Sequence, residues 1–474
     1  KKKYYYKNIT SNSNIFWKNT VDSYQSYYGN NTFEFLNKKK KFSKIDWNFS
    51  DYGKLWNYNL VYFDFLNQKD LELKESLNLI HNFIGKDDIH ISGNEPYTIS
   101  LRNINWIKFL LINDIKDRGI DDYLFNSYKS LIDNLEYHLL GNHLLENAFS
   151  LIFGAYYFDN TDFYKKAKKI LMKELDIQIL NDGGHFELSP MYHSIILHRI
   201  LDCIYLMDNN SIDSTDLYKK LRNKAVLMLS WLESISYKNN EIPHFNDSVD
   251  GVSLSPKELF IYANSIGIKW NKSTLDESGY RKFSNEKYEC IIDVGPLGPQ
   301  YLLGHSHSDI SNFEFRYKSI PFIVDTGTST YENNKTRIIE KSTNSHNTIM
   351  VNDINQSEMW NSFRVGRVAK VINLFEENNF VSVSHNGYSH INIQHCREFL
   401  FNDNSIIIKD KVKGPHLTNI KSSIHFHPDR KIKLLNNSVL IDDKVELKLI
   451  NHIKLKVINY NYCEGFNKTK KAKK

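Results

Sequence analysis

The spacing of apolar residues changes near residue 285, and this change limits the fold more than any other feature of the chain. Before it, apolar side chains recur every three or four residues, as at Leu55, Tyr58 and Tyr62, which is typical of one buried face of an α-helix. After it, short β-branched or aromatic runs such as SNFEFRY and PFIVDTG are separated by turn residues, which is typical of strands. The pattern therefore predicts a helical region followed by a β region.

Helical segments follow one another through the first part of the chain, with few strand-like runs between them. They are expected near residues 51–67, 98–114, 121–139, 143–158, 161–176, 187–207 and 213–236. Helical hairpins in series form a toroid or solenoid, and short strands in series form an antiparallel sandwich. The expected domains are an irregular N-terminal segment that packs on the toroid (1–50), the toroid (51–280) and the β-sandwich (281–474).

The composition limits the classes of partner. The 474 residues carry a net charge of +6, much of it in the lysine runs KKKYYYK at the start, KKKKFSK at 38–44 and KTKKAKK at the end. These runs are expected to be solvated tails, and the nearly neutral remainder argues against nucleic acid while leaving an acidic polymer open. No apolar run approaches the ~18 residues that a membrane-spanning helix needs. The four cysteines lie far apart and predict neither a disulfide framework nor a zinc ribbon.

Two polar segments interrupt the helical pattern. In GNHLLENA (141–148), Asn142 and His143 open a helix, where an asparagine is often only a cap. In NDGGHFELSPMYHS (181–194), glycines and a proline punctuate a loop dense in polar groups, and such a loop between apolar helices is more often a site than a linker. The segment PHFNDSVDG (243–251) is a third candidate of the same kind.

A fourth group of motifs lies in the β region. GHSHSDISNFEF, IPFIVDTGTSTY and KSTNSHNT carry three histidines and two aspartates: His305, His307, His346, Asp309 and Asp325. Imidazole and carboxylate groups suit a closed divalent-metal site, with zinc as the natural candidate, although a chain with 18 histidines also clusters some by chance.

Taken together, DGGHFELSPMYH, GNH and the series HxHxD, DTGT and STNSHNT resemble the heparinase II/III superfamily of polysaccharide lyases, whose members include heparan-sulfate and oligoalginate lyases. The resemblance runs from about residue 50 to about residue 430. It implies an α+β multidomain fold, in which an incomplete (α/α) toroid is joined to an antiparallel β-sandwich, in agreement with the periodicity. It also implies β-elimination at the uronic acids of an acidic polysaccharide, in the periplasm or outside the cell. No signal peptide is visible, and because the chain begins at Lys1 rather than Met, the compartment stays open.

The resemblance implies roles for four residues. β-Elimination needs a neutralised carboxylate, a base for the C5 proton and an acid for the departing oxygen. Asn142 matches the family's carboxylate-neutralising asparagine, and His143 matches a position that serves as base in several members. Tyr192 matches the tyrosine that acts as acid and, for some substrate epimers, also as base. His305 matches the histidine that reaches the substrate carboxylate.

The resemblance also implies one structural metal ion, zinc or another divalent metal, held by His307, Asp325 and His346. Asp309 is then expected to orient a histidine. An alternative has His346 facing the substrate and another residue completing the metal shell. His305 and His307 would point the same way on a regular strand, so the segment after Gly304 is expected to be irregular.

The remaining candidates concern substrate binding and rival functions. The residues expected to contact substrate are Glu187, His193, Asn246, Arg364 and Arg397, although surface arginines are common on sheets. One alternative is a toroidal glycoside hydrolase, whose two carboxylates would come from Asp182, Glu187 or Asp247. Another is a glycan-binding protein without catalysis. Heparan sulfate, heparin, alginate and capsular uronans all remain open as substrates, as do endo or exo action and the oligomeric state.

Overall fold

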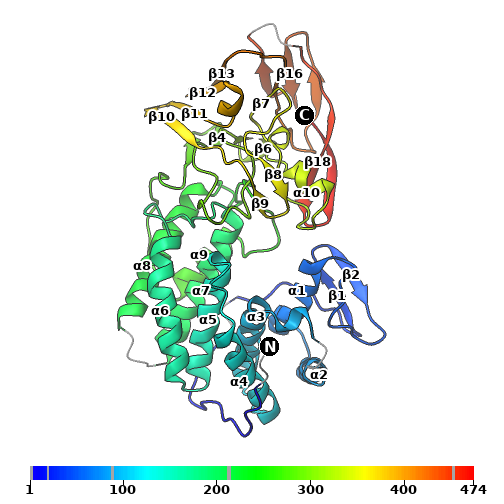
Figure 1. The fold of residues 1–474 in the computed structure, drawn as a ribbon, viewed down its shortest axis with the longest axis vertical. Coiled ribbons are helices and arrows are strands. Elements are labelled where there is room, and N and C mark those ends of the chain that lie inside the picture. The colour runs from blue at the N-terminus through cyan, green and yellow to red at the C-terminus, as the bar shows by residue number, and fades with distance from the viewer. Residues whose placement is uncertain (1–3, 19–20, 87–89, 211–214, 451–453) are drawn as a thin grey trace. The chain divides into compact units, whose positions relative to one another are not determined.

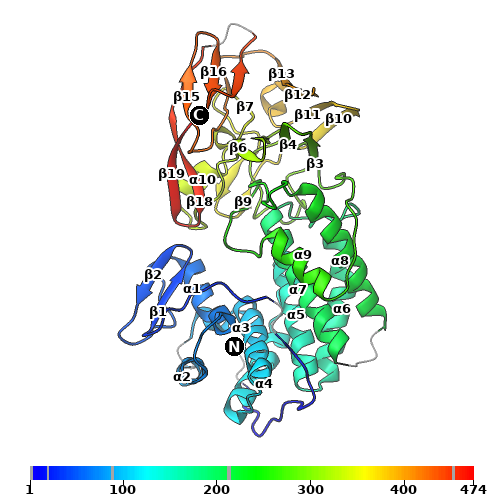
Figure 2. The same cartoon turned by 180° about the vertical axis from the view of Figure 1, so that it is seen from behind.

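The computed structural model describes residues 4–18, 21–86, 90–210, 215–450 and 454–474. They form two compact units, each with its own elements (Figures 1 and 2). The first unit comprises Lys1–Ile179, Ile195–Val226 and Glu258–Trp270, and the second comprises Leu180–Ser194, Leu227–Lys257 and Asn271–Lys474.

The predicted order of a helical region before a β region is confirmed, although a two-stranded hairpin precedes the helices. The helices and 3-10 turns of the helical region are α1 (Lys54–Tyr62), η1 (Asp64–Asn67), α2 (Leu73–Ile84), η3 (Ser92–Asn94), α3 (Pro96–Ile112), α4 (Arg118–Asp133), α5 (Gly141–Tyr157), α6 (Thr161–Gln178), α7 (Pro190–Asn209), α8 (Thr215–Ile235) and α9 (Pro256–Ser265). The segment predicted as one helix over 51–67 is divided at Phe63, whose left-handed backbone (φ 59°) ends α1 before η1 begins. None of the described helices is long and apolar enough to cross a membrane.

Helix α5 is the most deeply buried helix of the first unit. Every one of its residues is buried except His143, and it packs against α3, α4 and α6. Gly154 permits one of these contacts, because a Cβ there would lie 2.7 Å from the ring of Tyr128 on α4. A helix that is buried on all sides belongs to a core, so the single partly exposed position near its start stands out.

Buried charges tie four helices of the first unit together. Asp202 on α7 accepts hydrogen bonds from Lys108 on α3 (2.6 Å), Arg199 (3.2 Å) and Tyr262 on α9 (3.0 Å). Arg199 also pairs with Glu146 on α5 at 3.3 Å. Burial raises the pKa of Glu146 to about 7. Because isolated charges are costly inside a protein, each group depends on its partners.

We predict that Asp202→Asn destabilises the protein by about 3–5 kcal/mol, because it leaves Lys108 and Arg199 with an unmatched buried positive charge. Urea denaturation followed by circular dichroism measures the loss. Asp208→Asn on the same helix is the matched control, since Asp208 is partly exposed and its ion pair with Arg222 spans 3.6 Å. Its cost is expected to stay below about 1 kcal/mol. Equal losses in the two variants would contradict the role given to Asp202.

Two four-stranded antiparallel sheets dominate the second unit. One has the order β3 (Tyr280–Ser284), β4 (Tyr288–Asp293), β5 (Phe313–Tyr317), β6 (Ile320–Ile323), and the other has β10 (Val371–Glu377), β11 (Phe380–His385), β12 (Gln394–Phe401), β13 (Ile406–Lys413). Buried and less buried residues alternate along β11 and β12, and β4 is buried throughout. Side chains of both sheets, such as Ile292, Phe313, Val383 and Phe399, share one apolar core, which confirms the predicted antiparallel sandwich.

Smaller elements complete the second unit. They are α10 (Lys335–Glu340), the pair β14 (Ile420–Ser422) with β7 (Ile349–Val351), the pair β8 (Met359–Asn361) with β9 (Arg364–Val365), the sheet β15 (Ile432–Leu434), β16 (Ser438–Ile441), β17 (Val445–Lys448), and the hairpin β18 (Asn459–Gly465), β19 (Lys468–Lys473). The motif loops adjoin these elements: 304–312 precedes β5, 324–331 follows β6, and 341–348 leads into β7. No strand is assigned from Gly304 to Asn312, so the irregular segment expected there is confirmed.

The lysine runs expected to be solvated tails are strands at two of the three places. Lys38–Lys41 form β2, which pairs with β1 (Thr32–Phe35) in a hairpin of the first unit, and Lys468–Lys473 form β19. The lysines of β2 face outward in alternation, and Lys39 lies over the ring of Tyr28 at 3.7 Å. Lysine is favoured on exposed edge strands because it discourages further strand pairing. The run at the start of the chain lies partly outside the described residues.

Candidate active site and metal centre

The loop before α7 is shaped by its glycines and its cap. Gly183 has φ 94°, and a Cβ there would lie 2.1 Å from the carbonyl oxygen of Leu227, so only glycine fits. Pro190 begins α7, and the hydroxyl of Ser189 accepts a hydrogen bond from the amide of Tyr192 (3.2 Å) as an N-cap. Tyr192 therefore sits on a rigid first turn rather than on a free loop.

Tyr192 and His305 meet in the second unit. Their ring centroids are 4.0 Å apart, and the hydroxyls of Tyr192 and Tyr331 are 3.2 Å apart. Burial, followed by the neighbouring Tyr331, raises the pKa of Tyr192 well above its ordinary value. The phenol is therefore neutral near pH 7 and holds a proton that it can donate to a departing oxygen.

Carboxylates flank His305 on both sides. Its Nδ1–H donates to Asp247 Oδ2 (2.9 Å), and its Nε2 lies 3.6 Å from Glu187 Oε2. The imidazole side chain keeps 15% of its surface exposed, whereas Glu187 is 2% exposed. His305 is thus held from behind by Asp247 while one part of the ring remains accessible.

Asn142 and His143 form a separate group in the first unit. Asn142 is buried at the start of α5, and the side chain of His143 is 33% exposed. His143 Nδ1–H donates to Glu136 Oε1 (3.0 Å), and its ring lies 4.4 Å from that of Tyr97. Because Nδ1 is taken by Glu136, Nε2 is the nitrogen left to accept a proton from a ligand. Glu136 is itself fixed by Asn147 (2.9 Å).

The other residues expected to bind substrate lie at different depths. His193 and Asn246 are buried, and their polar atoms are used internally: His193 Nε2 bonds to the Met228 carbonyl (3.0 Å), and Asn246 bonds to the Leu188 carbonyl and the His307 amide. Arg397 is 1% exposed and pairs with Asp410 through two hydrogen bonds of 2.7 and 2.9 Å. Among the residues expected to contact substrate, Arg364 is the one that is exposed, and it lies on β9. The structure thus places His193, Asn246 and Arg397 beneath the surface.

A compact group of potential metal ligands comes from the motifs of the β region. Asp309, Asp325 and His346 are all buried, and their ligand atoms lie within 4.8 Å of one another. His346 Nδ1 lies 2.7 Å from Asp325 Oδ2. Asp325 and His346 belong to the predicted ligand set, but Asp309 occupies the place expected for His307 in this group.

His307 is turned toward Asp247 instead, which is why it falls outside that group. Its Nε2–H donates to Asp247 Oδ1 (2.9 Å), while its ring lies 5.2 Å from the ring of His346. Around this group, three of the buried atoms that have no hydrogen-bond partner in the described part of the chain are His307 Nδ1, Asp309 Oδ2 and His346 Nε2. Unpaired buried polar atoms are rare, and nitrogen and carboxylate donors are those that zinc takes, so these residues fit a divalent ion.

Sequence patterns missed the residues that organise this region. Asp247 was considered only as a hydrolase carboxylate, and Tyr331 and Arg337 were not singled out. Arg337 Nη1 and Nη2 donate to the two oxygens of Asp247 at 2.5 and 2.6 Å. The residues are 90 positions apart, so no local motif could have revealed the pair. The polar segment around Asp247 was the one available signal.

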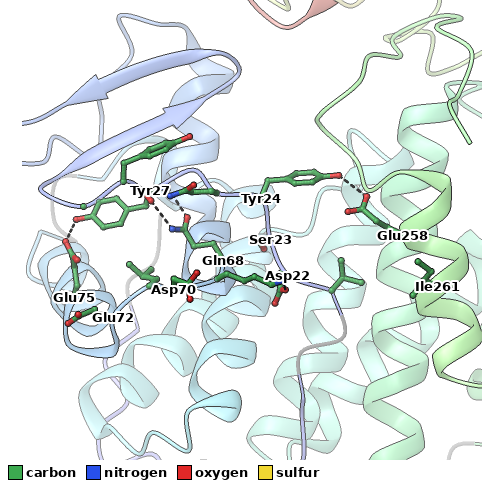
Figure 3. Close-up of a pocket in the computed structure, with 16 residues that line it drawn as sticks. Asp22, Ser23, Tyr24, Tyr27, Gln68, Asp70, Glu72, Glu75, Glu258 and Ile261 are labelled. Carbon is green, nitrogen blue, oxygen red and sulfur yellow. Dashed lines mark hydrogen bonds and ion pairs between the residues drawn. The ribbon is translucent and has the colours of Figure 1, made fainter. Parts of the chain in front are cut away.

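A large cavity of the first unit has the wrong charge for an acidic polymer. It has a volume of about 960 Å³ and is lined by tyrosines and five carboxylates: Asp22, Asp70, Glu72, Glu75 and Glu258. Figure 3 shows Tyr27 bonded to Glu75 and Tyr24 bonded to Glu258, the latter at 2.9 Å. Among the described residues that line it, Lys69 is the one cation, so this cavity repels polyanions.

Comparisons with known proteins agree with this fold. A crystal structure of heparinase III aligns with a TM-score of 0.66 at 17% identity, covering 92% of this chain and 76% of that chain. The heparan sulfate lyase HepC from Pedobacter heparinus aligns with a TM-score of 0.57, also at 17% identity, covering 94% and 78%. The fold is therefore that of the proteins in which a helical toroid precedes an antiparallel β-sandwich.

Family models and a curated relative identify the family within this fold class. The heparinase II/III N-terminus model matches residues 97–263, and the heparinase II/III-like C-terminal model matches residues 268–472. A heparin-sulfate lyase of Bacteroides stercoris is 23% identical over 343 residues, which make up 65% of this chain and 48% of that protein. The chain thus spans about half the length of this curated relative. It belongs to the heparinase II/III family.

We predict that the group around Asp325 and His346 binds one divalent ion whose removal destabilises the fold. A ligand present at a hundred times its Kd adds about 2.7 kcal/mol of stability. Chelation should therefore lower the Tm by several degrees, and zinc should restore it. His346→Ala should have the lower Tm already and should not respond to chelator. A wild-type Tm that is unchanged by chelation, with no metal found by mass spectrometry, would contradict the prediction.

Proposed function

We propose that this chain is a polysaccharide lyase that cleaves uronic-acid-containing polysaccharides by β-elimination. The observation that carries the proposal is the packing of the neutral phenol of Tyr192 on His305, whose imidazole is held by Asp247. Membership of the heparinase II/III family supports it, as does the name of the curated relative, a heparin-sulfate lyase.

In the proposed mechanism each reaction requirement falls to a named side chain. Asn142 and His305 neutralise the uronate carboxylate, so that the C5 proton becomes acidic. His143 removes that proton, because the neutral phenol of Tyr192 cannot accept one, and Tyr192 gives its phenolic proton to the departing C4 oxygen. The bond from C4 to the glycosidic oxygen breaks, and the electron pair of the C5–H bond becomes the C4–C5 double bond.

A divalent ion, zinc in this proposal, would have a structural role. It would be held by Asp325 and His346 with His307 and Asp309 beside them, and it would supply cross-linking of the three motif loops. None of the proton transfers above is assigned to it.

The carboxylates available to a glycoside hydrolase are poorly suited to that reaction. Asp182 Oδ2 accepts hydrogen bonds from the amides of Asp276 (3.0 Å) and Ser278 (2.9 Å) and from the Ser278 hydroxyl (2.6 Å). Asp247 is saturated by its own donors, as described above. An inverting or retaining hydrolase needs two carboxyl groups that face the sugar, and among these candidates only Glu187 is left.

We predict that Tyr192→Phe lowers kcat by about 10²–10⁴-fold while KM changes little, because the variant loses a proton donor but keeps the ring. The assay follows the ultraviolet absorbance of the C4–C5 double bond. Tyr205→Phe, the same deletion later in α7, is the matched control and should keep wild-type turnover. Full activity in Tyr192→Phe would refute the assigned role.

The substrate is proposed to be a uronan of low sulfation. Of the two arginines expected to contact substrate, Arg397 is paired with Asp410 and Arg364 is exposed. Of these two positions, one therefore offers a cation to sulfates, which favours a substrate with fewer of them.

We predict the order of turnover in a substrate panel. Desulfated heparan, alginate or a capsular uronan should be cleaved with a higher kcat/KM than heparin, because heparin carries more charge than the site can pair. The same absorbance assay measures each rate, with the non-uronic polymer dextran as the negative control. A clear preference for heparin would contradict the inference from Arg397.

A further inference from the structure

One carboxylate serves both the histidine of the proposed chemistry and a histidine of the metal centre. Asp247 is fully buried and accepts five hydrogen bonds with its two side-chain oxygens. His307 Nε2 (2.9 Å), Thr328 Oγ1 (3.1 Å) and Arg337 Nη1 (2.5 Å) donate to Oδ1. His305 Nδ1 (2.9 Å) and Arg337 Nη2 (2.6 Å) donate to Oδ2.

The charge of Asp247 is secured by this environment. The guanidinium of Arg337, which has only donors, meets both oxygens of Asp247 at 2.5 and 2.6 Å, so the group is present as a carboxylate. A carboxylate has no proton to give, so every nitrogen bonded to it must be a donor. Its two oxygens therefore dictate which nitrogen of each imidazole carries a proton.

For His307, the consequence concerns the metal. Because Nε2 carries the proton that is donated to Asp247, Nδ1 is the nitrogen whose lone pair is left for a ligand bond. Nδ1 is also the atom that is buried without a partner in the described residues, on a ring 5.2 Å from that of His346. Bonds of this kind from a carboxylate to the far nitrogen are the usual means of orienting a metal-binding histidine.

For His305, the consequence concerns the substrate. Its Nδ1–H is anchored to the other oxygen of the same carboxylate, which fixes the plane of the ring against Tyr192. The backbone reinforces the arrangement, because the amide of Asp247 donates to the carbonyl of His305 (3.1 Å).

We propose that Asp247 is a shared positioning residue: through one oxygen it presents Nδ1 of His307 to a divalent cation, and through the other it sets His305 for catalysis. This inference rests on the proposed lyase function for its second half only. The first half concerns metal binding and stands without it.

The test replaces the carboxylate with its closest uncharged analogue. In Asp247→Asn, one oxygen becomes an amide nitrogen that cannot accept hydrogen bonds, and the loss of charge weakens the hold on both histidines. We expect zinc affinity, measured by isothermal titration with zinc chloride alone, to fall about 10–100-fold. At saturating zinc, kcat should also fall about 10–100-fold, with a smaller change in KM. Wild-type zinc affinity, or wild-type kcat, overturns the shared role.

Two further variants keep the test decisive. If Asp247→Asn fails to fold because Arg337 is left unpaired, the double variant Asp247→Asn/Arg337→Met removes both buried charges, and the same losses are expected of it. Asp429→Asn is the matched control, since its side chain is 53% exposed and pairs with Lys470 at the surface. If the wild-type protein cleaves no uronan, the proposed function fails, while the zinc titration still decides the role of Asp247.

Discussion

The buried ion pair of Asp247 with Arg337 is the interaction on which the candidate site depends. Both side chains have no exposed surface, and the guanidinium meets the carboxylate through two parallel hydrogen bonds. Such a pair recovers the cost of its desolvation only when the geometry is good and the remaining lone pairs are used. His305, His307 and Thr328 use them, and the carbonyl of Ser362 accepts from the other side of Arg337 (3.1 Å). Stability and site geometry therefore come from the same contacts.

In the second unit, an apolar core supports the strands, and polar loops carry the candidate site residues. The strands are fixed by the sandwich core, and the three motif loops adjoin the strand ends. Hydrogen bonds tie these loops to other segments, as where the amide of His307 donates to Asn246. The loop before α7 joins the same network, because the hydroxyl of Ser189 donates to the carbonyl of Asp247 (2.8 Å). Hydrogen bonds to neighbouring segments thus position the catalytic candidates, and proton transfer requires such fixed distances.

The sequence predicted well wherever a local pattern has one physical meaning. The change from a helical to a strand period gave the order of the two regions, and α5 begins within two residues of its predicted start because Gly141, Asn142 and His143 mark it. Lysine-rich strands were missed, since charge alone resembles a tail and their pairing depends on partners such as β1. Arg397 was expected at the surface, but Asp410 lies opposite it on β13, a match that only the sheet register reveals.

The potential metal ligands show the same limit of prediction from local sequence patterns. The resemblance implied His307, Asp325 and His346 as ligands, but which nitrogen of His307 faces the group depends on Asp247, a residue 60 positions away. Asp309 was assigned an orienting role and lies instead among the potential ligands. Hydrogen bonds between residues far apart in the sequence determine which atoms face the metal group, and such bonds produce no periodic pattern in the sequence.

Cleavage of a uronan in water enriched in ¹⁸O tests the central claim most directly. β-Elimination breaks the bond from C4 to the glycosidic oxygen without consuming water, so the account predicts products that carry an absorbing C4–C5 double bond and no ¹⁸O. Mass spectrometry of products from the best substrate of the panel, with Tyr192→Phe as the inactive comparison, reads both features at once. Products that contain ¹⁸O at the new ends and lack the double bond would show hydrolysis and contradict the account.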